Sequence, residues 1–112
     1  MSELSGEPLI RVVRSLSLAA DDQLRELDRL EFPVGVDELA LQFDDRAVLS
    51  DQLVASAEVS EERGEIVRQL SALLARMSGK DNARLWTRDG LKSAPEWAQV
   101  RQLATQFLEL PY

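Results

Sequence analysis

The sequence predicts an all-α protein, folded as a compact bundle of about five or six helices. Apolar residues recur at helical spacing through most of the chain, and glycine and proline residues separate these runs. The composition supports a folded core, because 45% of the residues are hydrophobic and 29% are charged. At 112 residues the chain is long enough for one such core, so we expect a single helical domain over residues 1–112.

The first expected helix begins near Pro8 and continues through Leu30. Two shorter helices, broken around residues 15–17, would fit nearly as well, but we favour the single helix. Proline and glycine two positions apart then predict a loop in the sequence Phe32-Pro33-Val34-Gly35. The apolar positions of the helix lie close to heptad spacing and are Ile10, Val13, Ala20, Leu24 and Leu27.

Residues 36–49 can be interpreted in two ways. Leu39, Leu41 and Phe43 alternate like the residues of a strand, which would give a short extended segment near residues 38–43. A lone strand would have no partner in this chain, so we favour a helix capped by Asp37, and we expect a further helix over residues 46–57. The helix would bury one apolar stripe: Val36, Leu39, Ala40, Phe43 and Ala47.

The second half of the chain contains the clearest helical patterns. Ser60 is the expected N-cap of a helix that Gly79 ends. Asp81 or Asn82 would cap a short helix carrying Leu85 and Trp86, and Gly90 would close it. The buried stripe of the long helix is expected at Ile66, Val67, Leu70, Leu73, Leu74 and Met77.

The last helix is predicted by its capping residues and its apolar stripe. Ser93 and Glu96 have the spacing of a capping box, Pro95 suits the first turn, and Pro111 would end the helix. The expected buried residues are Trp97, Val100, Ala104, Phe107 and Leu108.

Composition excludes several kinds of chemistry. The chain has no cysteine and no histidine, so thiolate metal sites, thiol nucleophiles and histidine bases are absent. We therefore predict no catalytic residue, no metal ligand and no cofactor. Apolar runs are only a few residues long, so we expect a cytoplasmic protein without a signal peptide or a membrane span.

Charge is distributed unevenly along the chain. Residues 16–62 carry thirteen acidic residues against three basic ones, whereas residues 63–104 carry eight basic residues against four acidic ones. Such polarity can steer a charged partner, but it can equally be neutralised within the fold or between two copies of the chain.

One acidic cluster resembles half of a known motif. Glu61, Glu62 and Glu65 have the E-E-x-x-E form found in all-helical nucleotide pyrophosphatases of the MazG-like type, whose clustered acids hold magnesium. That family also requires an E-x-x-D sequence on the following helix, and residues 77–93 contain none. We therefore favour a simpler role, in which these acids stabilise the positive end of the helix dipole.

A basic residue occupies every fourth position from Arg76 to Lys92, and both tryptophans lie nearby. Binding to nucleic acid would pair these bases with phosphates and use Trp86 as a stacking platform. Gly79 and Gly90 interrupt the stretch, however, so a continuous basic stripe is not expected. The strongly acidic residues 16–62 also oppose binding to nucleic acid. We favour a core role for Trp97, because it belongs to the apolar stripe of the last helix, whereas Trp86 could face either the core or solvent.

The remaining interpretation is a surface that binds protein. We expect a non-enzymatic module that binds another protein or associates with itself, for example as a homodimer. The alternative is an immunity- or antitoxin-type inhibitor of a basic partner. A nucleic-acid-binding regulator and a magnesium-dependent pyrophosphatase rank below both. The expected binding residues form an acidic patch of Asp37, Glu38, Asp44 and Asp45 and a second patch of Arg84, Trp86 and Arg88.

Overall fold

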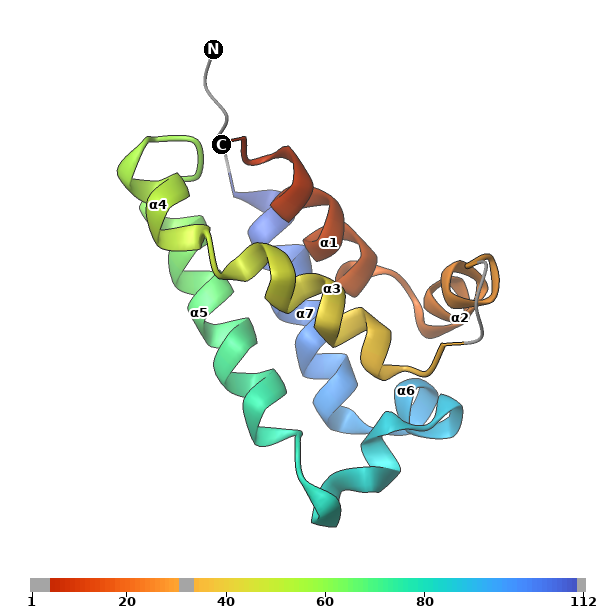
Figure 1. Cartoon of the computed structure of the whole chain (residues 1–112). Coiled ribbons are helices and arrows are strands. Elements are labelled where there is room, and N and C mark those ends of the chain that lie inside the picture. The colour runs from red at the N-terminus through yellow and green to blue at the C-terminus, as the bar shows by residue number, and fades with distance from the viewer. Residues whose placement is uncertain (1–4, 31–33, 111–112) are drawn as a thin grey trace.

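The computed structural model describes residues 5–30 and 34–110, which form seven α-helices and one 3-10 helix (Figure 1). These residues contain no strand, which confirms the all-α prediction. The number of helices in the described residues is higher than expected, because the helix expected from Pro8 to Leu30 is divided in two and a short helix over Arg88–Ser93 was not predicted. The helices are α1 (Glu7–Ser17), α2 (Ala20–Asp28), α3 (Asp37–Ala47), α4 (Ser50–Ala55), α5 (Glu61–Arg76), the 3-10 helix η1 (Lys80–Trp86), α6 (Arg88–Ser93) and α7 (Pro95–Glu109).

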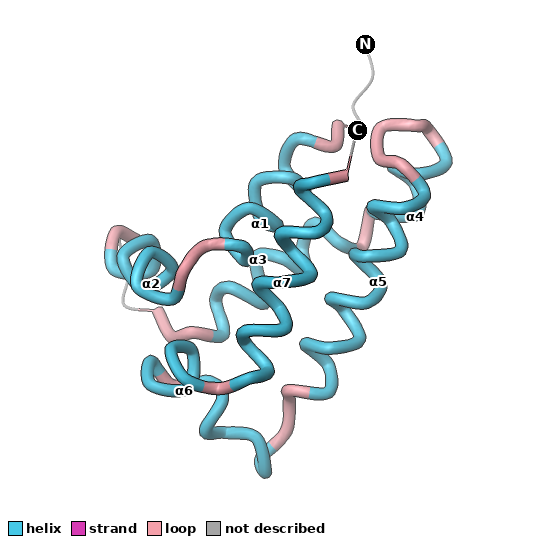
Figure 2. The backbone as a smooth tube through the Cα atoms, turned by 180° about the vertical axis from the view of Figure 1, so that it is seen from behind, coloured by secondary structure: helices cyan, strands magenta, loops and turns pink. Residues whose placement is uncertain are grey.

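Four of these helices, α1, α3, α5 and α7, pack around one core. The most extensive packing is between α1 and α7, followed by α5 with α7 and α1 with α3, and α3 also contacts α5. Helices α5 and α7 lie side by side in the view from behind (Figure 2). The smaller helices flank this core, with α2 against α6 and α4 against α5. The largest fully buried side chains are Trp97, Phe43 and Phe107.

The single helix expected through Leu30 is wrong, and the two-helix alternative describes the chain. The backbone is extended at Leu18 and Ala19, with ψ angles of 155° and 151°. The side chain of Gln23 explains the break, because its amide nitrogen donates to the carbonyls of Ser15 and Leu16 at 3.1 Å each. Helix α2 thus caps the end of α1 with a fully buried amide.

Helix α3 confirms the favoured interpretation of residues 36–49 and excludes the extended segment at 38–43. Its helical turn buries Leu39 and Phe43 and leaves Leu41 on the opposite side. Asp37 is the first helical residue and forms no side-chain cap, so the predicted cap is wrong. The helix expected over 46–57 is shorter, because α3 extends through Ala47 and α4 begins only at Ser50.

Helix α5 matches its prediction closely. The Ser60 hydroxyl accepts a hydrogen bond from the backbone N–H of Arg63 at 3.2 Å, and every residue of the predicted stripe is buried. The helix ends at Arg76, just before Gly79 adopts a φ of +110°. This left-handed backbone favours glycine, and it turns the chain into η1.

The residues predicted to begin and end the short helix around Leu85 and Trp86 have other roles. Asp81 lies inside η1, which has no side-chain cap. Asn82 does not cap η1; its amide donates to the carbonyls of Arg76 and Ser78 and so closes the end of α5. Gly90 does not end a helix but lies inside α6, where η1 crosses closely. A Cβ atom at this position would lie 2.2 Å from the backbone oxygen of Arg84.

The final helix has the predicted stripe but not the predicted cap. Ala94 precedes α7 without a side-chain cap, while the Ser93 hydroxyl donates to the carbonyl of Asp89 at 2.8 Å. Pro95 lies in the first turn as expected. The predicted stop at Pro111 lies outside the described residues, as do Phe32 and Pro33 of the predicted loop. The stripe buries Trp97, Val100, Ala104 and Phe107 and half-buries Leu108.

Candidate functional site

The predicted acidic patch lies on the solvent side of α3. Asp37, Asp44 and Asp45 are exposed, whereas Glu38 is half-buried and accepts a hydrogen bond from the Gln42 amide at 3.3 Å. Asp37 and Asp44 are seven residues apart, so they lie on one side of the helix. Three carboxylates of the patch therefore face solvent, one from the first turn of α3 and two from its last turn.

Large apolar side chains are exposed among these carboxylates. Leu41 is 51% exposed and Val48 is 76% exposed. They lie about one helical turn before and after Asp44, so they border it on the helix surface. Sequence reasoning missed both residues, although Leu41 falls off the buried stripe once α3 is helical. We define the α3 face as Asp37, Leu41, Asp44, Asp45 and Val48.

The second predicted patch does not form one surface. The bidentate ion pair between Arg88 and Asp28, at 3.0 and 3.1 Å, ties α6 to α2, and Arg84 lies 3.7 Å from Glu96. The five basic residues at every fourth position from Arg76 to Lys92 are distributed over α5, η1 and α6, so they follow no single helix. Both arginines are thus engaged by acidic side chains of the same chain.

Trp86 is half-buried and faces the interior through its indole nitrogen. Its N–H donates to the carbonyl of Met77 at 2.8 Å. The ring meets that of Trp97 edge to face, with centroids 5.4 Å apart and planes at 82°. Trp97 is fully buried, in agreement with its predicted core role, and donates to the carbonyl of Leu85 at 2.6 Å.

The structure brings one residue of each predicted patch into the same cleft. Asp44 of α3 and Trp86 of η1 both line a cleft of about 250 Å³ that α5 completes. Arg84, Arg88 and the other predicted acids do not line it. We call this site the Asp44–Trp86 cleft. Its remaining lining residues are mostly small: Ala40, Ser71, Leu74, Ala75 and Ser78.

The electrostatics of the cleft are set by one carboxylate. Partial burial raises the pKa of Asp44 above its ordinary value, and the neighbouring charge of Asp45 raises it further. An ionised Asp44 is therefore incompletely solvated. A carboxylate and an aromatic ring that line one cleft suit a guanidinium or ammonium group, which can bind to both.

Carboxylate clusters elsewhere do not form a metal centre in the part of the chain that the structure describes. No group of three or more aspartate, glutamate, histidine or cysteine side chains is placed there to hold a metal ion. Glu61, Glu62 and Glu65 are exposed in the first turns of α5, and Glu65 is paired with Arg68 at 3.0 Å.

Comparisons with protein-family models, with curated proteins and with solved structures find no match to this chain. Function must therefore be inferred from the surface chemistry of the protein itself. Across residues 5–30 and 34–110, no helix has both the length and the apolar character needed to cross a membrane.

Proposed function

We propose that the protein is a non-enzymatic protein-interaction module that binds a basic segment of a partner protein on its α3 face. The proposal rests on one observation: Asp44 and Trp86 line the same cleft. Exposed Leu41 and Val48 lie on either side of Asp44 and add apolar contact area. The proposed setting is the cytoplasm, as expected from the sequence.

The cleft would receive an arginine or lysine side chain of the partner. Its cationic group would pair with the Asp44 carboxylate and contact the Trp86 ring, which contributes about 0.5–2 kcal/mol in favourable geometries. Because Asp44 is already partly desolvated, a bound cation restores electrostatic stabilisation that solvent does not fully supply. Apolar side chains of the partner would then cover Leu41 and Val48.

The surrounding charge would speed association and select the partner. Asp37 and Asp45 are exposed on the same face, within the acidic residues 16–62. Their field attracts a basic segment and repels an acidic one, which affects the association rate and specificity more than the final affinity. A basic partner is therefore favoured over an acidic one.

A second candidate function is an immunity- or antitoxin-type inhibitor, supported by the same acidic residues. In that form the α3 face would cover the functional surface of a basic protein. The two forms differ in a measurable way, because inhibitor binding abolishes the activity of its partner whereas adaptor binding leaves that activity intact. The nucleic-acid alternative ranks lower, since Arg84 and Arg88 already lie near acidic side chains. The pyrophosphatase alternative ranks lower, since residues 77–93 contain no E-x-x-D sequence.

The proposal can be tested with a capped peptide that alternates arginine and leucine. NMR titration should shift the signals of α3 and the Trp86 indole, and the same peptide with citrulline in place of arginine should bind much more weakly. Asp44→Asn should weaken binding about tenfold, the scale of a charge-assisted hydrogen bond.

Asp45→Asn is the matched control, because it removes the same charge from an exposed residue that does not line the cleft. Its effect on affinity should be about twofold or less, as for an exposed charge. Equal losses from both substitutions, or equal binding of the citrulline peptide, would contradict the proposal.

A further inference from the structure

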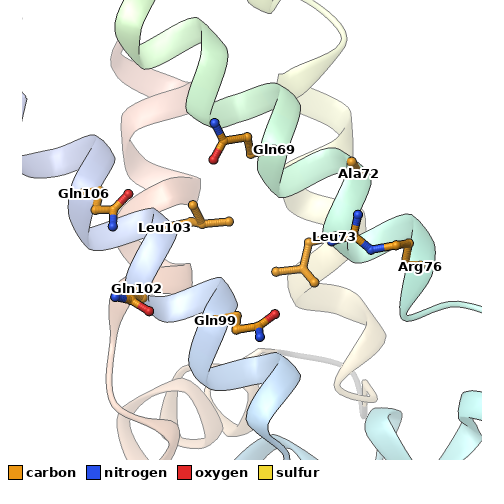
Figure 3. Close-up of a pocket in the computed structure, with 8 residues that line it drawn as sticks. All are labelled: Gln69, Ala72, Leu73, Arg76, Gln99, Gln102, Leu103 and Gln106. Atoms are coloured by element: carbon orange, nitrogen blue, oxygen red, sulfur yellow. The ribbon is translucent and has the colours of Figure 1, made fainter.

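A groove between α5 and α7 lies outside the proposed binding site. It has a volume of about 390 Å³, and its two walls are single helices (Figure 3). Leu73 and Leu103 point into it from opposite helices. The α5 wall contributes Gln69, Ala72, Leu73 and Arg76, and the α7 wall contributes Gln99, Gln102, Leu103 and Gln106.

The middle of this groove is uncharged, although 29% of the chain is charged. Arg76 is the one charged residue among its lining residues. Along α7, Arg101 is the only charged residue between Glu96 and Glu109. Arg101 is half-buried and donates to the carbonyl of Leu91 instead of facing solvent. Depletion of charge with retention of amide and apolar groups is typical of the centre of a protein interface.

The two ends of the groove carry opposite charge. Helices α5 and α7 are antiparallel, because Arg63 near the start of α5 donates to the carbonyls of Phe107 and Leu110 at 3.0 Å each. Glu62 precedes Gln69 by two turns on the same stripe, and Glu109 follows Gln102 in the same way. Arg63 also lies at this end, but its guanidinium is half-buried and is bound to the two carbonyls, so the exposed charges there are the carboxylates of Glu62 and Glu109. The exposed charge at this end is therefore acidic, while Arg76 makes the other end basic.

These terminal charges are available for a partner. Among the residues that the structure describes, Glu62, Glu109 and Arg76 are all exposed and form no ion pair. The nearby pairs involve other side chains, such as Glu65 with Arg68.

We propose that a second copy of this chain occupies the groove, related by a two-fold axis through the groove centre. The axis reverses the direction of the helices, so Arg76 of one protomer meets the acidic end of its partner, and the reciprocal contact forms as well. Glutamine amides both donate and accept hydrogen bonds, so equivalent glutamine side chains can pair across the axis. Leu103, which is half-buried in the monomer, would add apolar contact at the centre, beside Leu73, which is buried within each protomer.

Charge favours a second copy over other occupants. A uniformly basic segment would be repelled at Arg76, and a uniformly acidic one would be repelled at Glu62 and Glu109. An antiparallel copy of the same face satisfies both ends at once. This dimer goes beyond the binding of a basic partner, because it uses the α5–α7 side and leaves the α3 face open (Figures 1 and 2).

Sedimentation equilibrium of the full chain at low salt tests the proposal. The wild-type protein should form a dimer, and Arg76→Glu should weaken it about tenfold or more through like-charge repulsion. Adding Glu62→Arg to that variant should restore most of the affinity by exchanging the two charges. Arg46→Glu is the matched control, since it makes the same charge change at an exposed position of α3 and should leave the dimer intact.

A second measurement locates the interface directly. The chain contains no cysteine, so Gln102→Cys near the groove centre should form an intermolecular disulfide under mild oxidation. Gln52→Cys on exposed α4 should not. A wild-type monomer at all concentrations, a dimer indifferent to Arg76→Glu, or equal crosslinking of both cysteine variants would overturn the proposal.

The outcomes separate this dimer from the proposed binding of a basic partner. Asp44→Asn should leave dimerisation unchanged, and Arg76→Glu should leave the affinity for the arginine peptide unchanged. A monomer that binds the peptide would overturn the dimer alone, whereas a dimer that ignores the peptide would overturn the proposed function alone.

Discussion

The segment over residues 79–97 and the segment over residues 36–59 use their side chains in opposite ways. In the first, Asn82, Trp86 and Trp97 all donate hydrogen bonds to backbone carbonyls of neighbouring elements. These bonds satisfy carbonyls at the ends of α5 and η1. The segment is thus attached to the bundle by directional contacts as well as by apolar burial.

The second segment, residues 36–59, exposes charged and large apolar side chains to solvent. Neither α3 nor α4 has a side-chain cap at its start. Leu41 and Val48 are exposed, and the carboxylates of Asp44 and Asp45 repel each other. Substitutions in the first segment should therefore reduce stability, whereas substitutions on the α3 face should reduce binding.

The largest expected effect comes from Gly90→Ala. The new Cβ would lie 2.2 Å from the Arg84 oxygen and 3.0 Å from the Leu85 backbone, and neither backbone group can move away cheaply. Alanine is otherwise favoured within a helix, so any loss reflects this close approach. We expect the free energy of unfolding in urea to fall by about 3 kcal/mol or more.

Gly64→Ala is the control for that prediction, because Gly64 is also helical. Its Cβ would meet the side chain of Val54 and no backbone of another element. The new Cβ would lie 2.7 Å from the Cγ2 atom of Val54, so this side chain must shift. A side chain shifts at lower cost than a backbone, and alanine is favoured in a helix, so we expect a loss of about 1 kcal/mol or less. Similar losses for the two variants would show that crowding by the η1 backbone is not the cause.

The next largest loss of stability is expected at the two tryptophans, and it should be greater for buried Trp97 than for half-buried Trp86. Trp97→Phe removes the donor to the buried Leu85 carbonyl and leaves space in the core, so unfolding should become easier by about 2 kcal/mol. Trp86→Phe leaves the carbonyl of Met77 without its donor at a half-buried position and should cost about 1 kcal/mol. Urea denaturation followed by circular dichroism measures both, and the reverse order would contradict the assigned burial.

A smaller effect on stability is expected at the α3 face. Val48→Ser and Leu41→Ser remove exposed apolar groups, so the free energy of unfolding should change by no more than about 0.5 kcal/mol. Both variants should nevertheless bind the arginine–leucine peptide more weakly, as measured by NMR titration. A large loss of stability would mean that these side chains support the fold and are not reserved for a partner.

The smallest effect concerns the pH dependence of Asp44. Its raised pKa means that the folded protein favours the protonated carboxyl, so ionisation above that pKa destabilises the fold. Asp44→Asn should therefore raise the free energy of unfolding by a few tenths of a kcal/mol at neutral pH, an amount limited by solvent exposure. The difference from wild type should vanish as pH falls through the raised pKa toward the ordinary value of 3.8.

Asp45→Asn provides the comparison for this pH effect. It removes the repulsion on Asp44 but not the partial burial, which is the larger cause of the raised pKa. Its gain at neutral pH should be smaller than that of Asp44→Asn in the same denaturation series. A larger gain would identify repulsion as the dominant cause.

The sequence predicted the fold class and the two long helices α5 and α7, because long apolar stripes constrain a helix strongly. It did not predict the break between α1 and α2. Both short helices keep apolar residues toward the core, so the periodicity continues across a break that depends on the buried amide of Gln23. The capping box at Ser93 failed for a similar reason, since α6 uses that hydroxyl.

The candidate site was predictable only in part. The sequence grouped Asp37, Glu38, Asp44 and Asp45 into one acidic patch, because these residues are close together along the chain. The approach of Asp44 and Trp86 depends on how η1 packs against α3 and α5, and no local pattern encodes it. The bidentate pair of Arg88 with Asp28 likewise joins residues 60 positions apart.

The packing of α1 against α7 has a consequence for protein synthesis. Helix α1 leaves the ribosome before α7 and makes its most extensive contacts with it, so Leu9, Val13 and Leu16 cannot be fully covered until α7 has emerged. Contacts between such distant segments slow folding and prolong the exposure of apolar surface. These three apolar side chains should therefore stay partly exposed on the nascent chain until α7 has been synthesised.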